Sequence, residues 1–534
     1  MDTFGSDAGQ ILYDEHFTSD GTVRPIAEAL WNYLDELGLE ALVAHQSAAE
    51  SELRGIGVTF GDFSSSSGTS EVERRDAEER PWPFDVIPRI VAASEWDDIE
   101  QGLVQRLRAL NRFIDDCYHE QNAAQSGVVP SELVMGSPNF RPECVGAEPA
   151  GGIWAHICGS DLIRDSGGTV FVLEDNLRTP SGVSYMLENR MVAKRVFPEL
   201  FRSYSVEPID PYIGRLASLL SSLSPEATRA TVVVLTPGIH NSAYFEHSFL
   251  AQQMGIELVT ADDLVVLADG TVTMRTIDGL EKVDVIYRRI DDLYLDPEVF
   301  RRDSLIGVPG LIRAWRNGKV ALVNAPGAGV ADDKALYPFV PDMIRFYLDE
   351  EPILSNVPTY RCDDEKEREF VLANLPELVI KPSNEAGGYG VVIGPRVQDE
   401  ALRVVARRIE QNPRGWVAQP VMQLSTVPTL CEGETAARHV DLRPFTLLGP
   451  ESAYVTRGGL TRVARQSGSL IVNSSQGGGS KDTWIVDPSA LLVDALPVRQ
   501  GRSTSKLREL NAGSNLAGHS AIAPSAIRLH ESAQ

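Results

Sequence analysis

Hydrophobic and polar positions divide the chain into a helical first part and a later part in which strands and helices alternate. Up to about residue 150, apolar residues recur every three or four positions, over Arg24–Leu42 and most clearly over Glu95–Tyr118. This period predicts amphipathic helices, with an extended segment over Pro81–Arg89 between them. From Gly151 onward, short runs of β-branched and aliphatic residues predict strands instead.

The first two predicted strands form a hairpin. They cover Ile153–Ile163 and Thr169–Asn176, and the sequence Asp-Ser-Gly-Gly between them is typical of a tight turn. A helix is expected over Val183–Phe197. The next segment, 229–330, has strands near 231–235, 256–259, 283–287 and 320–323 and a helix over 244–254. This alternation predicts a parallel, doubly wound sheet.

Polar side chains cluster at the end of the second hairpin strand. Alternation along a strand places Glu174 and Asn176 on one face and Asp175 on the other, and the hairpin brings Asp161 towards them. Three oxygen ligands from neighbouring strands suit one or two divalent cations such as Mg²⁺. The alternative interpretation is a strand that simply runs into a polar turn.

Later strands carry basic residues near a glycine-rich segment. The predicted strand Glu377–Pro382 contains Lys381 and precedes Ser383–Gly390, whose glycines would let backbone N–H groups approach phosphates. An ordinary flexible hairpin is the alternative. Asp333-Lys334 is expected to open a helix, Asp399–Gln411 forms another, and Trp416–Val421 forms a strand. Arginines on the following strands favour a bound polyanion: Arg443, Arg457 and Arg462.

Other polar residues follow the predicted parallel strands, where ligands of such sheets bind. They are plausible substrate contacts or members of an ion-paired loop: His240, Asn241, Arg288, Arg289, Asp291 and Asp292. Arg89 is either a phosphate or carboxylate contact or a solvated side chain. The sequence contains no Walker A motif and no G-x-G-x-x-G after a predicted strand.

Charge and composition narrow the choice of partners. The net charge of −26 argues against nucleic acid as the main partner, while an anionic nucleotide remains compatible with a locally basic cleft. The five scattered cysteines indicate neither a disulfide framework nor a zinc site. No apolar run is long enough to cross a membrane, and the N-terminus lacks the features of a signal peptide, so a cytoplasmic protein is expected. Residues beyond about Asp487 lose periodicity and are expected to be partly disordered.

Together these motifs resemble the ATP-grasp ligases, but in a changed order. The metal strand with Glu174-x-Asn176 comes first, and the lysines, glycine loop and arginines follow, as in the circularly permuted bacterial type 2 group, which is similar to glutathionylspermidine synthase. Each motif is weak alone, whereas their joint order from about Tyr13 to Asp487 is specific. The resemblance implies a permuted α/β (α+β) ATP-grasp fold with five regions: a helical region 1–150, the metal-binding half 151–228, a Rossmann-like pre-ATP-grasp domain 229–330, the nucleotide-binding part 331–487 and a tail 488–534.

The resemblance also implies residue roles. Catalytic roles fall to Lys381, Arg443, Arg462 and Arg178, the last of which would face the acyl substrate with the turn Thr179–Gly182. ATP would be bound by Lys334, Lys381, Ser383, Gly387, Gly388 and Gly390, with an adenine hinge that includes Gln419, Val421 and Met422. Mg²⁺, as one or two ions, would be held by Asp161, Glu174 and Asn176.

The implied activity is that of an ATP-dependent carboxylate–amine ligase. It would form an amide through an acylphosphate, release ADP and phosphate, and use small-molecule or peptide acids and amines. A kinase or phosphotransferase on the same scaffold and a non-catalytic nucleotide-binding protein are the alternatives. Substrate identity and homo-oligomerisation stay open. The prediction requires Asn176 and Lys381 to lie on opposite sides of one ATP triphosphate.

Overall fold

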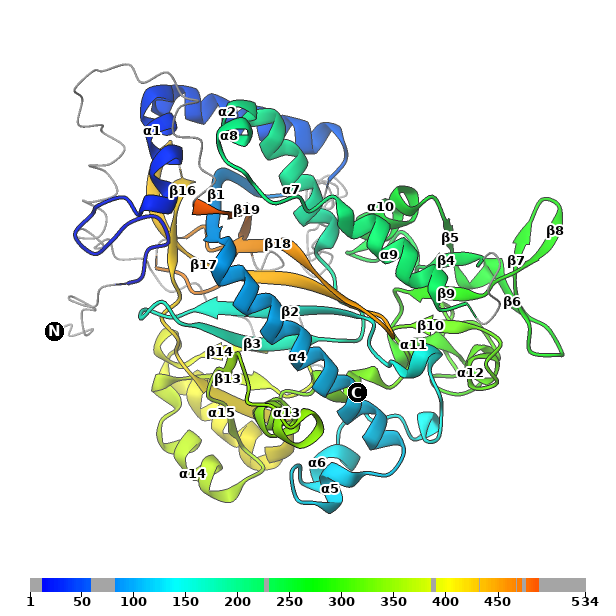
Figure 1. Ribbon diagram of the computed structural model, residues 1–534. Coiled ribbons are helices and arrows are strands. Elements are labelled where there is room, and N and C mark those ends of the chain that lie inside the picture. The colour runs from blue at the N-terminus through cyan, green and yellow to red at the C-terminus, as the bar shows by residue number, and fades with distance from the viewer. Residues whose placement is uncertain are drawn as a thin grey trace, which may run out of the picture.

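The central sheet joins segments from both ends of the chain. The computed structural model describes residues 12–58, 82–224, 230–385, 390–431, 433–466, 468–472 and 477–488. Its eight-stranded sheet crosses the middle of the molecule (Figure 1). In sheet order the strands are β1 (Phe84–Ala92), β19 (Gly479–Val486), β18 (Ala453–Val463), β17 (Glu434–Leu448), β2 (Ile157–Arg164), β3 (Val170–Asn176) and β11 (Ser355–Asn356), while β16 (Thr426–Cys431) pairs with β17.

The strand order shows how the two chain ends combine. Strand β2 of the predicted hairpin β2–β3 pairs with β17, and these two strands are antiparallel. Within the hairpin, Asp161 pairs with Glu174 and Gly159 with Asn176. An early hairpin is therefore built into a sheet whose other strands come mostly from the last hundred or so residues, which is the arrangement that a permuted fold requires.

Two long helices cover opposite faces of this sheet. The successive β19 residues Trp484 and Ile485 pack into different hydrophobic clusters, the first with α7 (Val183–Val196) and the second with α4 (Ala93–Tyr118). Figure 1 shows α4 running across the sheet. Both helices agree with the sequence prediction. The pairing of Asp175 with Arg106 of α4 places Asp175 on the α4 face.

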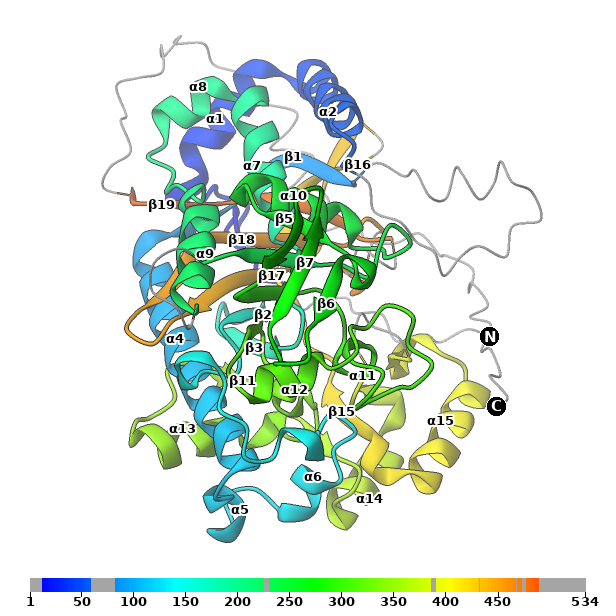
Figure 2. The same cartoon turned by 90° about the vertical axis from the view of Figure 1, so that its right-hand side faces the viewer.

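The N-terminal region contains helices and one strand of the central sheet. Its helices α1 (Glu28–Leu37) and α2 (Leu39–Gly55) pack beside α7 and α8 (Pro198–Ser203), whereas α5 (Asn122–Gln125) and α6 (Ser131–Met135) lie at the other end of the molecule, as Figures 1 and 2 show. The extended segment predicted around residue 85 is β1, a buried strand parallel to β19. The other helical segments are η1 (Pro25–Ala27), η3 (Pro142–Cys144) and η4 (Ala150–Gly152).

A second, four-stranded sheet is parallel throughout, as the alternating pattern predicts. Its order is β10 (Ala321–Val323), β9 (Val285–Arg288), β4 (Val232–Leu235) and β5 (Glu257–Val259). The accompanying helices are α9 (Pro211–Ser222), α10 (Tyr244–Met254), η5 (Ala261–Asp263), α11 (Asp292–Leu295) and α12 (Leu311–Arg316). A small antiparallel sheet that the sequence analysis missed projects beside it: β6 (Leu264–Val266), β7 (Val272–Thr276) and β8 (Gly279–Lys282).

The third region is a small antiparallel sheet below the central one in Figure 1. Its order is β12 (Tyr360–Arg361), β15 (Trp416–Pro420), β13 (Leu378–Pro382) and β14 (Val392–Ile393). One face packs on helices, while Val379 and Lys381 point from the other face into a cavity. The helical segments of this part are α13 (Val340–Leu348), α14 (Glu365–Ala373), η8 (Leu375–Glu377), η9 (Gly394–Arg396), α15 (Asp399–Gln411) and η10 (Pro413–Gly415).

Some local predictions were wrong. Asp333-Lys334 opens no helix: it lies between the short η6 (Ala328–Asp332) and η7 (Tyr337–Phe339) segments, and α13 begins only at Val340. The buried Asp333 side chain instead accepts hydrogen bonds from Arg414 and Ser137. The predicted strand Ile153–Ile163 begins at Ile157, and strands β16 and β19 were not predicted because neither sequence alternates in hydrophobicity.

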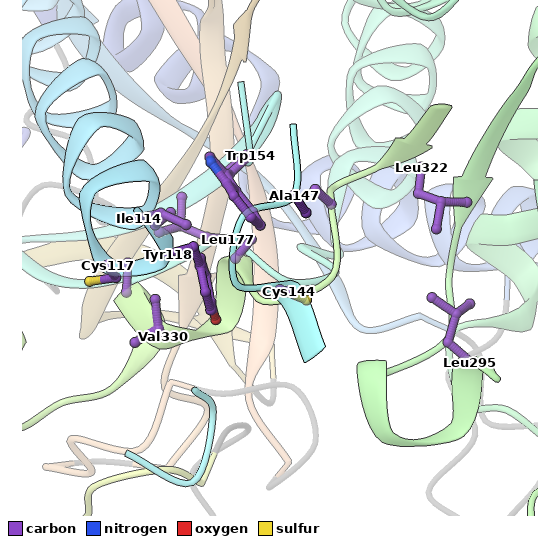
Figure 3. Close-up of a cluster of buried hydrophobic side chains, with 14 of the residues drawn as sticks. Ile114, Cys117, Tyr118, Cys144, Ala147, Trp154, Leu177, Leu295, Leu322 and Val330 are labelled. Carbon is purple, nitrogen blue, oxygen red and sulfur yellow. The ribbon is translucent and has the colours of Figure 1, made fainter. Parts of the chain in front are cut away.

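The main hydrophobic core connects the end of α4 to the end of β3. Tyr118 stacks on Trp154 with ring centroids 4.7 Å apart, and its hydroxyl donates to the Gly327 carbonyl oxygen at 2.9 Å. Leu177 and Val330 belong to the same cluster (Figure 3). The five cysteines are free thiols, four of them buried, as their spacing predicts. Among the described helices, none combines the length and the apolar character that a membrane span needs.

Candidate functional site

A cavity of about 200 Å³ lies between the small sheet and the central sheet. Its polar end contains most of the charged residues predicted as site residues, contributed by β2, β3, β13, β17 and β18 together with the segment after η6. These residues are Asp161, Glu174, Lys334, Lys381, Arg443 and Arg462, and Asp441, which was not predicted, lies among them. We call this space the nucleotide cavity, after the ligand that the sequence analysis predicts for it. It lies on the face of the central sheet opposite α4, because Asp161 and Glu174 alternate with side chains that pack on α4.

Two arginines and two carboxylates form the floor of the nucleotide cavity. Arg443 holds both Asp161 oxygens at 2.5 and 2.8 Å, and Arg462 Nη2 lies 2.7 Å from Asp161 Oδ2 and 2.5 Å from Asp441 Oδ2. Burial acts to raise the pKa of Asp161, but the two guanidinium groups outweigh it and leave that pKa well below its usual range. Burial also raises the pKa of Asp441, against the effect of Arg462.

Two lysines reach the same space from different segments. Lys334 Nζ lies 3.3 Å from Glu174 Oε2 and donates to the Glu385 carbonyl oxygen at 2.7 Å. Burial lowers the pKa of Lys381 to about 8, although the nearby Glu174 carboxylate acts to raise it. The structure therefore brings both lysines to the Glu174 strand, about 160 to 210 positions earlier in the chain.

The other end of the nucleotide cavity is apolar. It is lined by Ile163, Leu173, Val379, Val391, Ile393, Leu424, Leu470, Ile471 and Val472, together with the predicted hinge residues Gln419, Val421 and Met422. Gln419 Nε2 donates to Thr359 Oγ1 at 2.9 Å, and Pro420 and Val421, which follow it, also line this end. A cavity with one apolar end and one cationic end suits a ligand that joins a flat apolar ring to a polyanion.

The predicted glycine loop is only partly described. Gly387 and Gly388 lie outside the described residues. Gly390 has a φ of +71°, and an added Cβ would lie 2.8 Å from Pro382 Cγ, so this position needs glycine. Ser383 is buried, its N–H donates to the Gly415 carbonyl oxygen, and its side chain does not line the nucleotide cavity.

A second cavity, of about 330 Å³, adjoins the first and contains the predicted residues Asn176 and Arg178. It is lined by Asn176, Arg178, Thr179, Asp291, Asp332, Asn384 and Glu385, and Glu385 lines both cavities. We call it the Arg178 cavity. Asn176 and Lys381 thus line neighbouring spaces. Arg178 Nε lies 2.8 Å from Asp332 Oδ2 and its Nη1 lies 3.2 Å from Asp291 Oδ2.

The turn after β3 is anchored to the parallel sheet. Glu246 accepts hydrogen bonds from the N–H groups of Gly182 and Ser184 at 2.7 and 3.2 Å, at the start of α7. Arg289 binds Glu246 and the Pro180 carbonyl oxygen at 2.9 and 2.8 Å. These contacts fix the Thr179–Gly182 turn at the cavity wall.

Several arginines that the sequence analysis considered as ligand contacts are structural. Arg289 is buried against the turn, and Arg288 is fully buried with Asp292 at 2.7 Å. Arg89 is buried with Glu15, and Arg457 pairs with Asp97 and Glu100 away from the cavities. Of the polar residues after the parallel strands, Asp291 alone lines either described cavity; His240 and Asn241 do not.

The sequence analysis gave no role to three residues that shape the site: Asp332 and Glu385 line the cavities, and Glu246 anchors the turn after β3. Asp332 precedes the predicted Lys334, and Glu385 lies inside the predicted glycine loop, but neither position has a pattern of its own. Glu246 lies within the predicted helix 244–254, where its spacing does not mark it as a contact. Each gains its place only through contacts between distant segments.

The predicted metal ligands fit Mg²⁺ in part. Glu174 and Asn176 are half-buried oxygen donors at the junction of the two cavities, as Mg²⁺ prefers. Asn176 Nδ2 donates to the Gly159 carbonyl oxygen at 3.0 Å, so its amide oxygen is directed away from that bond. Both carboxylate oxygens of Asp161 are already ion-paired, with Arg443 and Arg462. Among the described residues, no three histidine, cysteine or acidic side chains are grouped as a metal site, so the amide of Asn176 is needed to complete the predicted set.

Comparisons with known proteins agree with this architecture. The model of the family "Circularly permuted ATP-grasp type 2" matches residues 88–464. An uncharacterized protein of Synechocystis is 53% identical over 479 residues, covering 90% of this chain and 98% of the relative. A Frankia alni protein named "Putative glutamate--cysteine ligase 2-3" is 43% identical over 481 residues, covering 89% of this chain and 54% of that longer protein. The structure of a glutathione synthetase-like effector from Globodera pallida, in its apo form, superposes with a TM-score of 0.54 at 11% identity, covering 84% of this chain and 98% of that one, which shows a shared fold.

Proposed function

Because this chain belongs to the circularly permuted ATP-grasp type 2 family, we propose that it is an ATP-dependent ligase that joins a carboxylic acid to an amine. One observation carries the proposal: charged side chains from distant segments converge on the polar end of a single cavity whose other end is apolar. They are Glu174, Lys334, Lys381, Arg443 and Arg462. The ligase name of the Frankia alni relative supports the same reaction class.

In this proposal ATP lies along the nucleotide cavity. The adenine ring packs in the apolar end, where backbone groups near Val421 read its edge, and the triphosphate extends towards Lys334 and Lys381. Glu174 and Asn176 would hold Mg²⁺, which would supply positive charge to the triphosphate when bound. Asp161 orients Arg443 and Arg462 through its three ion-pair contacts.

The proposed chemistry has two steps. A carboxylate oxygen of the acid substrate attacks the γ-phosphorus, the bond to the β-phosphate oxygen breaks, and ADP leaves with that electron pair. The amine nitrogen then attacks the acyl carbon, phosphate leaves, and the amine gives up a proton. A carboxylate and ATP repel each other, so Lys381, Arg443 and Arg462 are needed to offset the charge and to align the two reactants.

ADP release with and without amines tests this proposal. A ligase should release ADP only with its acid, and hydroxylamine should trap the acylphosphate as a hydroxamate. A stable phosphorylated product with no amide would support a phosphotransferase instead. Binding of ATP without turnover on any acid, and without hydroxamate, would support a nucleotide-binding protein that does not catalyse.

A further inference from the structure

The Arg178 cavity has an unusual balance of charge for a site that should receive a carboxylate. Its wall contains one guanidinium group, that of Arg178, and three carboxylates, those of Asp291, Asp332 and Glu385. The remaining lining residues, Asn176, Thr179 and Asn384, are neutral and polar. Its lining contains no apolar side chain, so a ligand group that enters it must be polar as well.

Arg178 is held in one orientation. Asp332 and Asp291 bind its Nε and Nη1, and Asp332 Oδ1 also accepts the N–H of Leu177 at 2.6 Å. Among the described residues, the second terminal nitrogen, Nη2, has no hydrogen-bond partner. A guanidinium fixed on two sides and free on the third is preorganised to bind a carboxylate.

The backbone around Arg178 is shaped for its side chain. A Cβ at Gly329 would lie 2.4 Å from Arg178 Cδ and 2.6 Å from its Cγ, so only glycine lets the arginine stem pass η6. Leu177, next to Arg178, and Val330, next to Gly329, are both buried in the core shown in Figure 3. The arginine is therefore mounted on a rigid support.

Two carboxylates of the Arg178 cavity have room to bind a cation. The Asp291 side chain is 36% exposed, and each of its oxygens accepts a single hydrogen bond at 3.2 Å. Glu385 is exposed at the mouth shared with the nucleotide cavity, and it binds Lys334 through its backbone carbonyl oxygen rather than through its carboxylate. Both oxygens of Asp332 already accept hydrogen bonds, from Leu177 N–H and Arg178 Nε, so this carboxylate serves mainly to hold the arginine.

We propose that the Arg178 cavity binds a substrate that carries both a carboxylate and a primary ammonium group, that is, an α-amino acid or the equivalent end of a peptide. Its carboxylate binds the free edge of Arg178, and its ammonium binds Asp291 and Glu385. This inference rests on the proposed ligase function, for which it specifies one substrate class. A plain carboxylic acid would leave the acidic wall uncompensated, and a polyamine would meet the Arg178 guanidinium.

Binding measurements on the full chain test the proposal. With Mg²⁺ and a non-hydrolysable ATP analogue present, the common amino acids are titrated beside their des-amino acids and their decarboxylated amines. At least one amino acid should bind at least about tenfold more tightly than both of its analogues. Equal binding of the des-amino acid, or binding of no amino acid while the nucleotide analogue binds, would overturn the proposal.

Two variants assign the contacts. Glu385→Gln should weaken amino-acid binding about tenfold or more and leave binding of the des-amino acid within about twofold, because Asp291 and Asp332 still hold Arg178. Asp303→Asn, which alters an exposed Arg–Asp pair elsewhere, is its control. Gly329→Ala should weaken both ligands because it displaces Arg178, while Gly214→Ala, with open space around its Cβ, should weaken neither. Full amino-acid affinity in Glu385→Gln would contradict the ammonium contact.

Failure of this inference and failure of the ligase proposal are distinguishable. Failure of the ligase proposal would appear in wild-type protein as no binding of the nucleotide analogue, or as neither ADP release nor hydroxamate with any acid. The same amino-acid titrations without nucleotide would then still decide whether the cavity takes an amino acid. Normal nucleotide binding with hydroxamate formed from acids that lack an amino group would keep the ligase and reject the amino-acid site.

Discussion

At the scale of single residues, adjacent carboxylates at the end of β3 have opposite environments. Glu174 faces the nucleotide cavity beside Lys334, whereas Asp175 is buried on the other face, where it accepts hydrogen bonds from Arg106 and Ser160 at 2.7 and 2.9 Å. The strand alternation alone explains this division. It separates a proposed catalytic side chain from a structural one.

This contrast gives the first prediction. Glu174→Gln should lower turnover by about 100-fold or more, because it removes a proposed metal ligand, and should leave the melting temperature nearly unchanged. Asp175→Asn should cost about 3–5 kcal/mol of stability, because the buried Arg106 loses its charged partner. Thermal melts and ADP-release assays on both variants measure these effects. An active Glu174→Gln enzyme would remove Glu174 from the mechanism.

The second prediction concerns Lys381 and pH. Its pKa is lowered to about 8 by burial, so in the ligand-free protein the ammonium is present below pH 8 and is lost as the pH rises through that value. ATP binds the charged form, so its affinity should fall above pH 8, by up to about tenfold per pH unit. Titration of a fluorescent ATP analogue between pH 6 and 10 measures this. Lys381→Arg should flatten the profile, because arginine stays charged; an unchanged profile would assign the effect to another group.

At the scale of secondary-structure elements, one buried ion pair ties the small sheet to the rest of the molecule. Arg414, in η10 before β15, donates to Asp333 Oδ2 at 2.6 Å and to the Leu133 carbonyl oxygen at 3.0 Å. Asp333 also accepts from Ser137 Oγ at 2.7 Å. The pair therefore joins β15, the segment that carries Lys334, and the N-terminal region.

The third prediction is that Asp333→Asn loosens this junction. Loss of the charged partner of Arg414 should destabilise the protein by about 3 kcal/mol and speed amide hydrogen exchange in β13 and β15 more than in β4 and β9. Hydrogen exchange monitored by mass spectrometry separates these strands. Asp342→Asn, which alters an exposed helix pair, is the matched control. Uniform acceleration across all sheets would argue against a local role.

At the scale of the whole molecule, the last described strand completes the central sheet. All eight residues of β19 are buried, between β1 and β18, and Lys481 is ion-paired with Asp85 of β1. Lys481 Nζ also donates to the carbonyl oxygens of Ile87 and Pro428, each at 3.0 Å. Strands from the start and the end of the chain therefore depend on each other.

The fourth prediction follows from this arrangement. A chain that ends at residue 478 lacks β19 and should not fold, because β1 and β18 would expose their inner edges. A chain that ends at residue 488 keeps every described strand and should match the full protein in melting temperature and ADP release. Circular dichroism and size-exclusion chromatography compare the two. A folded 478-residue chain would show that β19 is dispensable.

The fold class, the strand alternation and the family could be inferred from local patterns and motif order. Period-2 and period-3.6 patterns revealed the β2–β3 hairpin, α4, α7 and the parallel sheet. Strand β19 was missed because both of its faces are buried. Strand β16 was missed because its polar and apolar side chains are mixed, so neither sequence alternates in hydrophobicity. The helix expected at Asp333 was wrong because that carboxylate pairs with the distant Arg414.

The candidate site also contains residues that local sequence patterns identify and residues whose roles only the fold explains. The sequence by itself determined which side chains could bind a metal and phosphates, because residue type and strand period are local properties. Local patterns or the family resemblance pointed to Glu174, Asn176, Lys381 and Arg443. Only the tertiary structure decided that Arg443 and Arg462 rest on Asp161, that Arg288 and Arg289 are structural, and that Arg178 stands between Asp291 and Asp332. Each of these outcomes depends on which distant carboxylate the fold brings within about 3 Å of a guanidinium, and a linear pattern does not contain that distance.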